Sequence, residues 1–189
     1  MQYVAMGTRC LIGMIFLLAI IGKLAGRNPL GTFMISIRDM GVVPSGLIRP
    51  TALAVLICEC AVFALLVAPV TSAIMAGLAL AAALLLIFAA AVMLAIRRGV
   101  RAPCRCFGSA TTPLGTVHAV RNILLAAAAA LGAMAAPRAG SADAGPMILT
   151  AVTGLLGGGL ISVLDDVVAL FRPIPDSASI LPAGRKRDA

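Results

Sequence analysis

The sequence predicts an all-α membrane protein, a bundle of four transmembrane helices followed by a fifth, C-terminal transmembrane helix. Hydrophobic residues make up 61% of the 189 residues, charged residues make up 12%, and the mean hydropathy is +1.09. A soluble domain of this size has too little interior for so much apolar surface. The apolar residues also form blocks of roughly 20 residues, the length that crosses a bilayer. The composition therefore implies the lipid bilayer as the first partner.

The apolar blocks are expected to form one helical domain over residues 1–171. The expected spans are about 3–21, 50–68, 73–96, 114–136 and 146–164. No signal-peptide cleavage site closes the first span, because Gly22-Lys23-Leu24-Ala25 follows directly, so it is interpreted as an uncleaved helix. Residues 172–189 are basic and contain several prolines, which predicts a disordered tail.

Two shorter features complete the expected architecture. Asn28-Pro29 is typical of a helix start, and apolar residues then recur at helical spacing, which predicts an amphipathic interfacial helix over about 29–40. In the fifth span, Gly154 and Gly158 have the small-xxx-small spacing that indicates close helix packing. Asp165-Asp166 are expected to end this span.

The loop between the third and fourth spans contains Cys104 and Cys106. A disulfide between cysteines two positions apart closes a small ring, and departures from relaxed geometry make it easier to reduce. Arg101 and Arg105 would stabilise a thiolate by their charge. The spacing therefore indicates thiol–disulfide chemistry, with two inert thiols or a local structural disulfide as the alternative.

Other uses of the cysteines are weaker hypotheses. A zinc site built on Cys104, Cys106 and His118 lacks a clear fourth ligand, so no metal is predicted. Cys58 and Cys60 lie inside the second span, where positions i and i+2 diverge by about 200° and cannot readily bond to each other. These two thiols, and Cys10 in the first span, are interpreted as small hydrophobes, with a relay role as the alternative.

Polar residues inside the spans form a second set of candidates. Glu59 lies near the middle of the second span, where an unpaired carboxylate costs several kcal/mol, so it must be protonated, paired or hydrated. Lys23 and Arg121 are the available cationic partners, and Asn122 could hydrogen-bond between helices. A structural ion pair and a proton-handling site both remain open.

The basic residues, which give a net charge of +8, lie between the apolar blocks rather than along one helix face. This distribution indicates membrane topology and argues against nucleic acid as a partner. With five spans, one side of the membrane holds twelve basic residues and the other holds Arg9 and Arg138. The twelve are Lys23, Arg27, Arg38, Arg49, Arg97, Arg98, Arg101, Arg105, Arg172, Arg185, Lys186 and Arg187. The positive-inside rule then places Cys104 and Cys106 at the cytoplasmic face.

Over about residues 5–135 the sequence resembles the methylamine utilisation protein MauE family, within the wider DoxX-like group of membrane proteins. The matching features, in order, are Gly22-Lys23-Leu24, Glu59, Cys104-Arg105-Cys106-Phe107-Gly108 and Arg121-Asn122. The fifth span, the basic tail, Cys58 and Cys60 lie outside this pattern.

The resemblance implies a multi-pass protein of the bacterial plasma membrane with a redox role in amine metabolism. Proteins of this family are linked to maturation of the methylamine dehydrogenase light subunit, a disulfide-rich exported protein, together with a thioredoxin-like partner. A thioredoxin-like protein and an exported client are therefore the expected partners. No cofactor is evident in the sequence, and a quinone stays open.

Two hypotheses remain at this point. In the first, Cys104 and Cys106 cycle between dithiol and disulfide; in the second, the protein is a non-enzymatic membrane scaffold whose cysteines are structural or incidental. A donor of disulfides to exported proteins needs the loop on the outer face, whereas the charge distribution favours the cytoplasmic face. A transporter is disfavoured, because no internal repeat or pair of broken helices is found.

Overall fold

The computed structural model describes residues 1–25, 29–99, 116–138 and 143–170, and the side chains within them except at positions 29, 138 and 163–170. These residues form helices, with no strand among them. The helices are α1 (Gln2–Leu24), α2 (Pro29–Asp39), α3 (Ile48–Val67), α4 (Thr71–Arg97), α5 (Thr116–Ala135) and α6 (Ala144–Leu170). Two 3₁₀ turns, η1 (Ser45–Leu47) and η2 (Ala136–Arg138), precede α3 and follow α5.

Five helices of the described chain are long and apolar enough to cross a membrane. They are Gln2–Leu24, Ser45–Val67, Thr71–Arg97, Thr116–Ala135 and Ala144–Ser162. The predicted all-helical membrane fold with a fifth helix is therefore confirmed. The fifth helix does not end at the paired aspartates, because α6 continues past Asp165 and Asp166 to Leu170.

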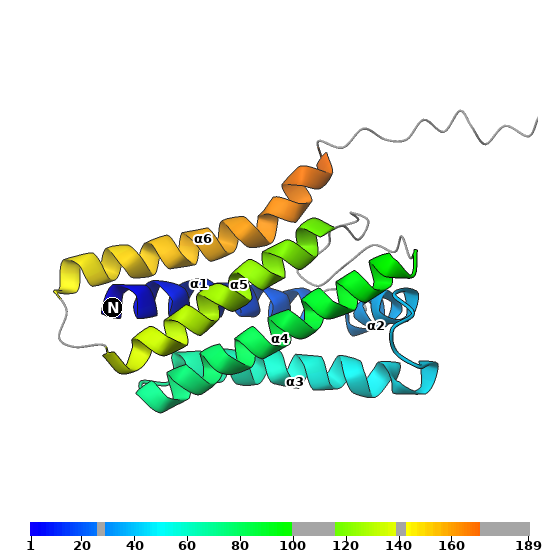
Figure 1. The fold of residues 1–189 in the computed structure, drawn as a ribbon, viewed down its shortest axis with the longest axis horizontal. Helices are drawn as coiled ribbons and strands as arrows, with labels where there is room; N and C mark the ends of the chain where they lie inside the picture. Colours follow the sequence, from blue (N-terminus) through cyan, green and yellow to red (C-terminus); the bar gives the residue numbers. More distant parts are fainter. Residues whose placement is uncertain (26–28, 100–115, 139–142, 171–189) are drawn as a thin grey trace, which may run out of the picture.

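The bundle is organised around α1, which packs against α3, α5 and α6, while α4 packs against α3 and α5 (Figure 1). The shorter α2 contacts α1 and the beginning of α3. Helix α3 tolerates Pro50 because this residue lies in the first turn, where backbone N–H groups have no intrahelical partner. Gly99 adopts a φ of +73° directly after α4 and so ends that helix.

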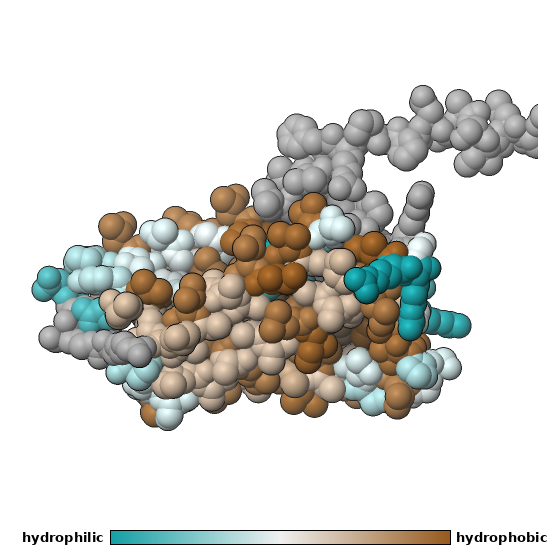
Figure 2. Space-filling view, viewed as in Figure 1, coloured by the Kyte–Doolittle hydropathy of each residue, from teal (hydrophilic) through white to brown (hydrophobic). Residues whose placement is uncertain are grey.

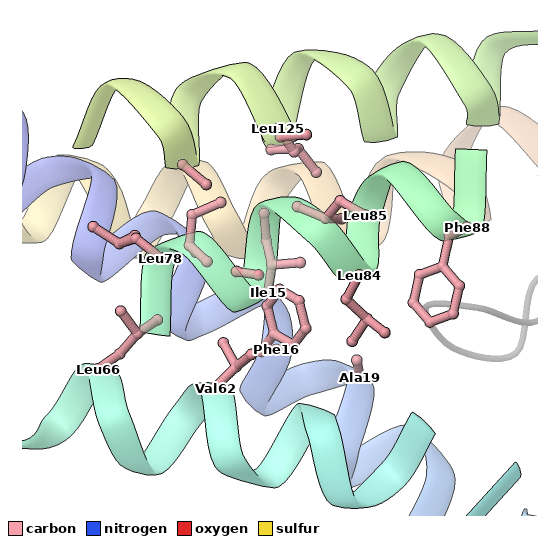
Figure 3. Packing of buried hydrophobic residues seen from close by; sticks show 14 of the residues in the cluster. Ile15, Phe16, Ala19, Val62, Leu66, Leu78, Leu84, Leu85, Phe88 and Leu125 are labelled. Atoms are coloured by element: carbon pink, nitrogen blue, oxygen red, sulfur yellow. The ribbon is translucent and has the colours of Figure 1, made fainter. Parts of the chain in front are cut away.

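The core forms where α1, α3, α4 and α5 meet. The side chains labelled in Figure 3 converge there: Ile15, Phe16, Ala19, Val62, Leu66, Leu78, Leu84, Leu85, Phe88 and Leu125. Large apolar residues also lie on the outer faces of the helices, for example Ile57, Ile87 and Leu156. Figure 2 shows apolar side chains across the middle of the visible face and hydrophilic residues at its two ends. This distribution suits helices that are solvated by lipid along their length.

Helix α6 packs against α1 at short range because glycines remove the side chains between the two backbones. A Cβ atom on Gly158 would lie 2.7 Å from the carbonyl oxygen of Leu11, and one on Gly154 would collide with the carbonyl oxygen of Gly7. Both obstacles are backbone atoms, which cannot rotate away. The predicted close contact through Gly154 and Gly158 is therefore present, and its partner is α1.

Replacing Gly154 or Gly158 by alanine should push α6 away from α1. Inserting a methyl group into a packed contact costs about 1–3 kcal/mol, so we expect each variant to lower the midpoint of thermal unfolding in detergent. Gly159→Ala is the matched control, because its Cβ would meet only the flexible end of Met14, at 3.9 Å. Equal stability of all three variants would contradict this account of the contact.

Candidate functional site

One end of the bundle contains most of the buried polar side chains in the described chain. This is the end at which α1 and α4 finish and α5 begins, with α2 beside it (Figure 1). The buried polar residues are Lys23, Ser36, Glu59, His118, Asn122 and Ser162. Lys23 lies in the last turn of α1, and His118 and Asn122 lie in the first turns of α5. Most of the buried polar side chains therefore lie where several helix ends meet, and the rest of the apolar spans has few of them.

Lys23 and Glu59 form a buried ion pair between α1 and α3. The Nζ atom of Lys23 donates a hydrogen bond to Oε1 of Glu59 at 2.8 Å, and the two side chains are 3% and 1% exposed. The same Nζ atom lies 4.8 Å from the ring centroid of Phe33 in α2, which adds a cation–π contact. Of the two cationic partners that the sequence offers, the structure places Lys23 on Glu59. The pair ties three helices together at one point.

Two buried oxygen atoms near this end have no hydrogen-bond donor within the described chain. They are Oε2 of Glu59 and Oδ1 of Asn122. A buried acceptor without a donor costs about 1–3 kcal/mol, so each oxygen is a place where a water molecule would be stabilised, and Oε2 of Glu59 is also a place where a proton would be stabilised. One carboxylate oxygen of Glu59 therefore accepts a hydrogen bond from Lys23, and the other is available to accept a further hydrogen bond.

Arg121 and Asn122, adjacent in sequence, differ in their burial on α5. Asn122 is fully buried, whereas Arg121 is half-buried. His118, one turn before Asn122, is also buried. The predicted polar residues of the fourth span therefore lie near the beginning of α5, immediately after the segment that contains the Cys-x-Cys pair.

Cys104, Cys106, Arg101 and Arg105 lie outside the described residues. Their segment joins the end of α4 to the beginning of α5. At that end, Nη1 of Arg98 donates a hydrogen bond of 2.7 Å to the carbonyl oxygen of Gly41, just after α2. This contact ties the end of α4 to the connection between α2 and α3.

The three described cysteines, Cys10, Cys58 and Cys60, are free thiols. Cys58 packs against the core, whereas Cys60 is exposed on the outside of α3, as expected for positions that diverge around a helix. Cys10 lies in the half of α1 farthest from Lys23. Within the described chain no group of three His, Cys, Asp or Glu residues could hold a metal ion.

Sequence reasoning missed two contacts. Phe33 is one of the apolar residues that recur in the amphipathic helix, and the sequence does not indicate that it covers the Lys23 ammonium group. Arg9 was read only as a topology signal, although it hydrogen-bonds three carbonyl groups at the end of α3. A lone arginine inside an apolar span was the available signal, because such a residue needs polar partners.

The fold and the buried polar groups define a multi-pass α-helical membrane protein with an intramembrane ion pair. Residues 1–135 match the family described as Methylamine utilisation protein MauE, and the chain belongs to that family. The matched residues include α1 to α5 and the Cys-x-Cys segment, whereas α6 follows them. No curated protein and no solved structure matches the chain.

Breaking the ion pair on one side should destabilise the protein more than removing both partners. Lys23→Met and Glu59→Leu each leave a buried polar group without its partner, which costs about 3–5 kcal/mol, whereas the double variant leaves an apolar contact. We expect each single variant to accumulate poorly and to unfold at lower temperature, and the double variant to recover much of the loss. Arg38→Met, an exposed cation on α2, is the control. If the stability losses of the two single variants simply add in the double variant, Lys23 and Glu59 are not coupled and this account is contradicted.

Proposed function

We propose that this protein is a membrane thiol–disulfide exchange protein in which Cys104 and Cys106 alternate between dithiol and disulfide. The observation that supports the proposal most is the position of the Cys-x-Cys pair. It lies within the family-matched residues and in the segment that joins the end of α4 to the polar beginning of α5. The thiols are thus close in sequence to the buried polar groups of α5 rather than in the middle of an apolar span.

The exchange step transfers two electrons and two protons. One of the two thiolates attacks the disulfide of a thioredoxin-like partner and forms a mixed disulfide, and the partner's leaving sulfur takes up a proton. The second thiol, after losing its proton, attacks the mixed disulfide. The partner is released with two thiols, and Cys104 and Cys106 are left joined. The reverse sequence oxidises the partner, and neither direction requires a bound cofactor.

Charged and polar residues would assist this step in two ways. Arg101 and Arg105 flank the cysteines in sequence, and their positive charge favours the thiolate form that reacts. The Lys23–Glu59 pair stabilises the helix ends at this side of the bundle, and Glu59 Oε2 offers an acceptor for a proton or water. Arg121 and Asn122 belong to the same supporting set.

The side of the membrane on which the loop lies determines the direction of electron flow. At the outer face of the bacterial plasma membrane, the pair would exchange with exported proteins and support their maturation. At the cytoplasmic face, which the basic residues favour, it would receive electrons from cytoplasmic thiols and pass them across the bilayer. The proposed client in either case is an exported, disulfide-containing protein.

Serine at either Cys104 or Cys106 should abolish exchange with a thioredoxin while the protein still accumulates. Each single variant retains one thiol and cannot form the Cys104–Cys106 disulfide, and the partner's own second thiol reverses any mixed disulfide that forms, so no net exchange is completed. The measurement is the rate of exchange by the purified protein in detergent.

Cys58→Ser and Cys60→Ser are the matched controls, because they have the same spacing but lie within α3. These variants should exchange at the wild-type rate. Full activity in the Cys104→Ser/Cys106→Ser double variant would contradict the proposal and favour a non-enzymatic scaffold.

A further inference from the structure

Arg9 occupies a second polar position, in the N-terminal half of α1, the helix that begins at the end labelled N in Figure 1. Its Nε atom donates to the carbonyl oxygen of Leu66 at 2.5 Å, and its Nη2 atom donates to those of Val67 and Ala68 at 3.1 and 3.2 Å. These carbonyls belong to the end of α3, where helices have oxygen atoms without intrahelical partners. Arg9 thus caps α3, and none of the three bonds uses its Nη1 atom.

The positive charge of Arg9 has no acidic partner within the described chain, where the ion pair present is Lys23–Glu59. Arg9 lies seven residues after Gln2, about 10 Å along α1, and its side chain reaches the level at which α3 ends. Long basic side chains extend in this way toward the headgroup region of a bilayer. At that level, the N–H groups of Arg9 that are not bonded to α3 can donate hydrogen bonds to a phosphate oxygen.

Two hollows meet at Arg9. The larger, with a volume of about 320 Å³, lies between α1, α3 and α6, and its walls include Gly13, Leu17, Phe63 and Leu155. The smaller, of about 110 Å³, also has Arg9 in its wall and adds the polar residues Gln2 and Thr71. A recess with three polar residues in its wall and an apolar groove therefore adjoin the same guanidinium group.

We propose that this groove binds one anionic phospholipid. The phosphate accepts hydrogen bonds from Arg9 Nη1, the headgroup occupies the recess beside Gln2 and Thr71, and one acyl chain lies along the groove. A lipid with net negative charge is favoured over a zwitterionic lipid, because Arg9 contacts the carbonyls of α3 but has no carboxylate partner in the described chain. Leu155 belongs to α6, so the helix beyond the family-matched residues completes the groove.

Gly13 makes the groove directly testable. A Cβ atom on Gly13 would meet nothing within 4 Å, so a larger side chain there would fill the groove without colliding with the protein. Gly13→Leu also replaces a poor helix former by a good one, so the variant should remain folded. Gly145→Leu is the matched control, because its Cβ also meets nothing within 4 Å and it lies outside the groove.

The experiment is native mass spectrometry of the full chain in detergent, titrated separately with phosphatidylglycerol and phosphatidylcholine. The wild type should bind the first phosphatidylglycerol about fivefold more tightly than the first phosphatidylcholine, because both lipids offer a phosphate oxygen to Arg9 but only phosphatidylglycerol brings a net negative charge. Arg9→Gln should abolish this preference. Gly13→Leu should weaken the first binding event of both lipids, and Gly145→Leu should behave as the wild type.

Equal binding of the two lipids by the wild type, or unchanged binding by Gly13→Leu, would overturn the proposal. A neutral isoprenoid that copurifies with the wild type and is displaced by Gly13→Leu would overturn it as well. Arg9→Gln also removes the cap on α3. If that variant does not fold, Gly13→Leu decides the matter, because it leaves the cap in place.

Discussion

The buried Lys23–Glu59 pair constrains the rest of this structure. It places a lysine from the last turn of α1 against a carboxylate in the middle of α3, at a distance of 2.8 Å and almost without solvent exposure. In lipid a single charge at either position would be costly, so the register of the two helices is set by the need to keep them together. Phe33 covers the ammonium group and so attaches α2 to the same point. The end of the bundle from which the Cys-x-Cys segment departs is therefore organised by one interaction.

The two ends of the molecule use basic residues differently. At one end Lys23 is neutralised by Glu59, while Arg38, Arg49, Arg97 and Arg98 remain exposed. At the other end Arg9 caps α3 and borders an apolar groove. Helix α6 contributes to that groove through Leu155, and Gly154 and Gly158 hold it close to α1. Helix α6, which follows the family-matched residues, thus adds to the outer surface of the bundle. It takes no part in the Lys23–Glu59 pair, which joins α1 and α3.

Much of the fold could be predicted from the sequence because bilayer-length apolar blocks have few alternatives to a helix. Glu59 likewise indicated a site at which the carboxylate is protonated, paired or hydrated, since an isolated carboxylate is expensive in lipid, and the structure shows that it is paired. Which cation pairs with Glu59, by contrast, depends on how α1 and α3 are rotated about their axes. The spacing of apolar residues along the sequence does not determine these rotations. The contact between Arg9 and the carbonyls of α3 and the Phe33 contact depend on the same rotations. The sequence also predicts the wrong end for α6. Asp165 and Asp166 end the apolar region, but charged residues outside the apolar region need not end a helix.

The measurement that tests the central claim most directly is maleimide labelling of a variant in which Cys10, Cys58 and Cys60 are replaced by alanine. The protein would be labelled in intact and in permeabilised cells, each with and without prior reduction. In the proposed cycle the pair is held as a disulfide between turnovers, so the account predicts that Cys104 and Cys106 react only after reduction. Labelling by an impermeant reagent in intact cells would then place the pair outside. A requirement for permeabilisation would place it at the cytoplasmic face. Free labelling without reductant in both preparations would contradict the redox account.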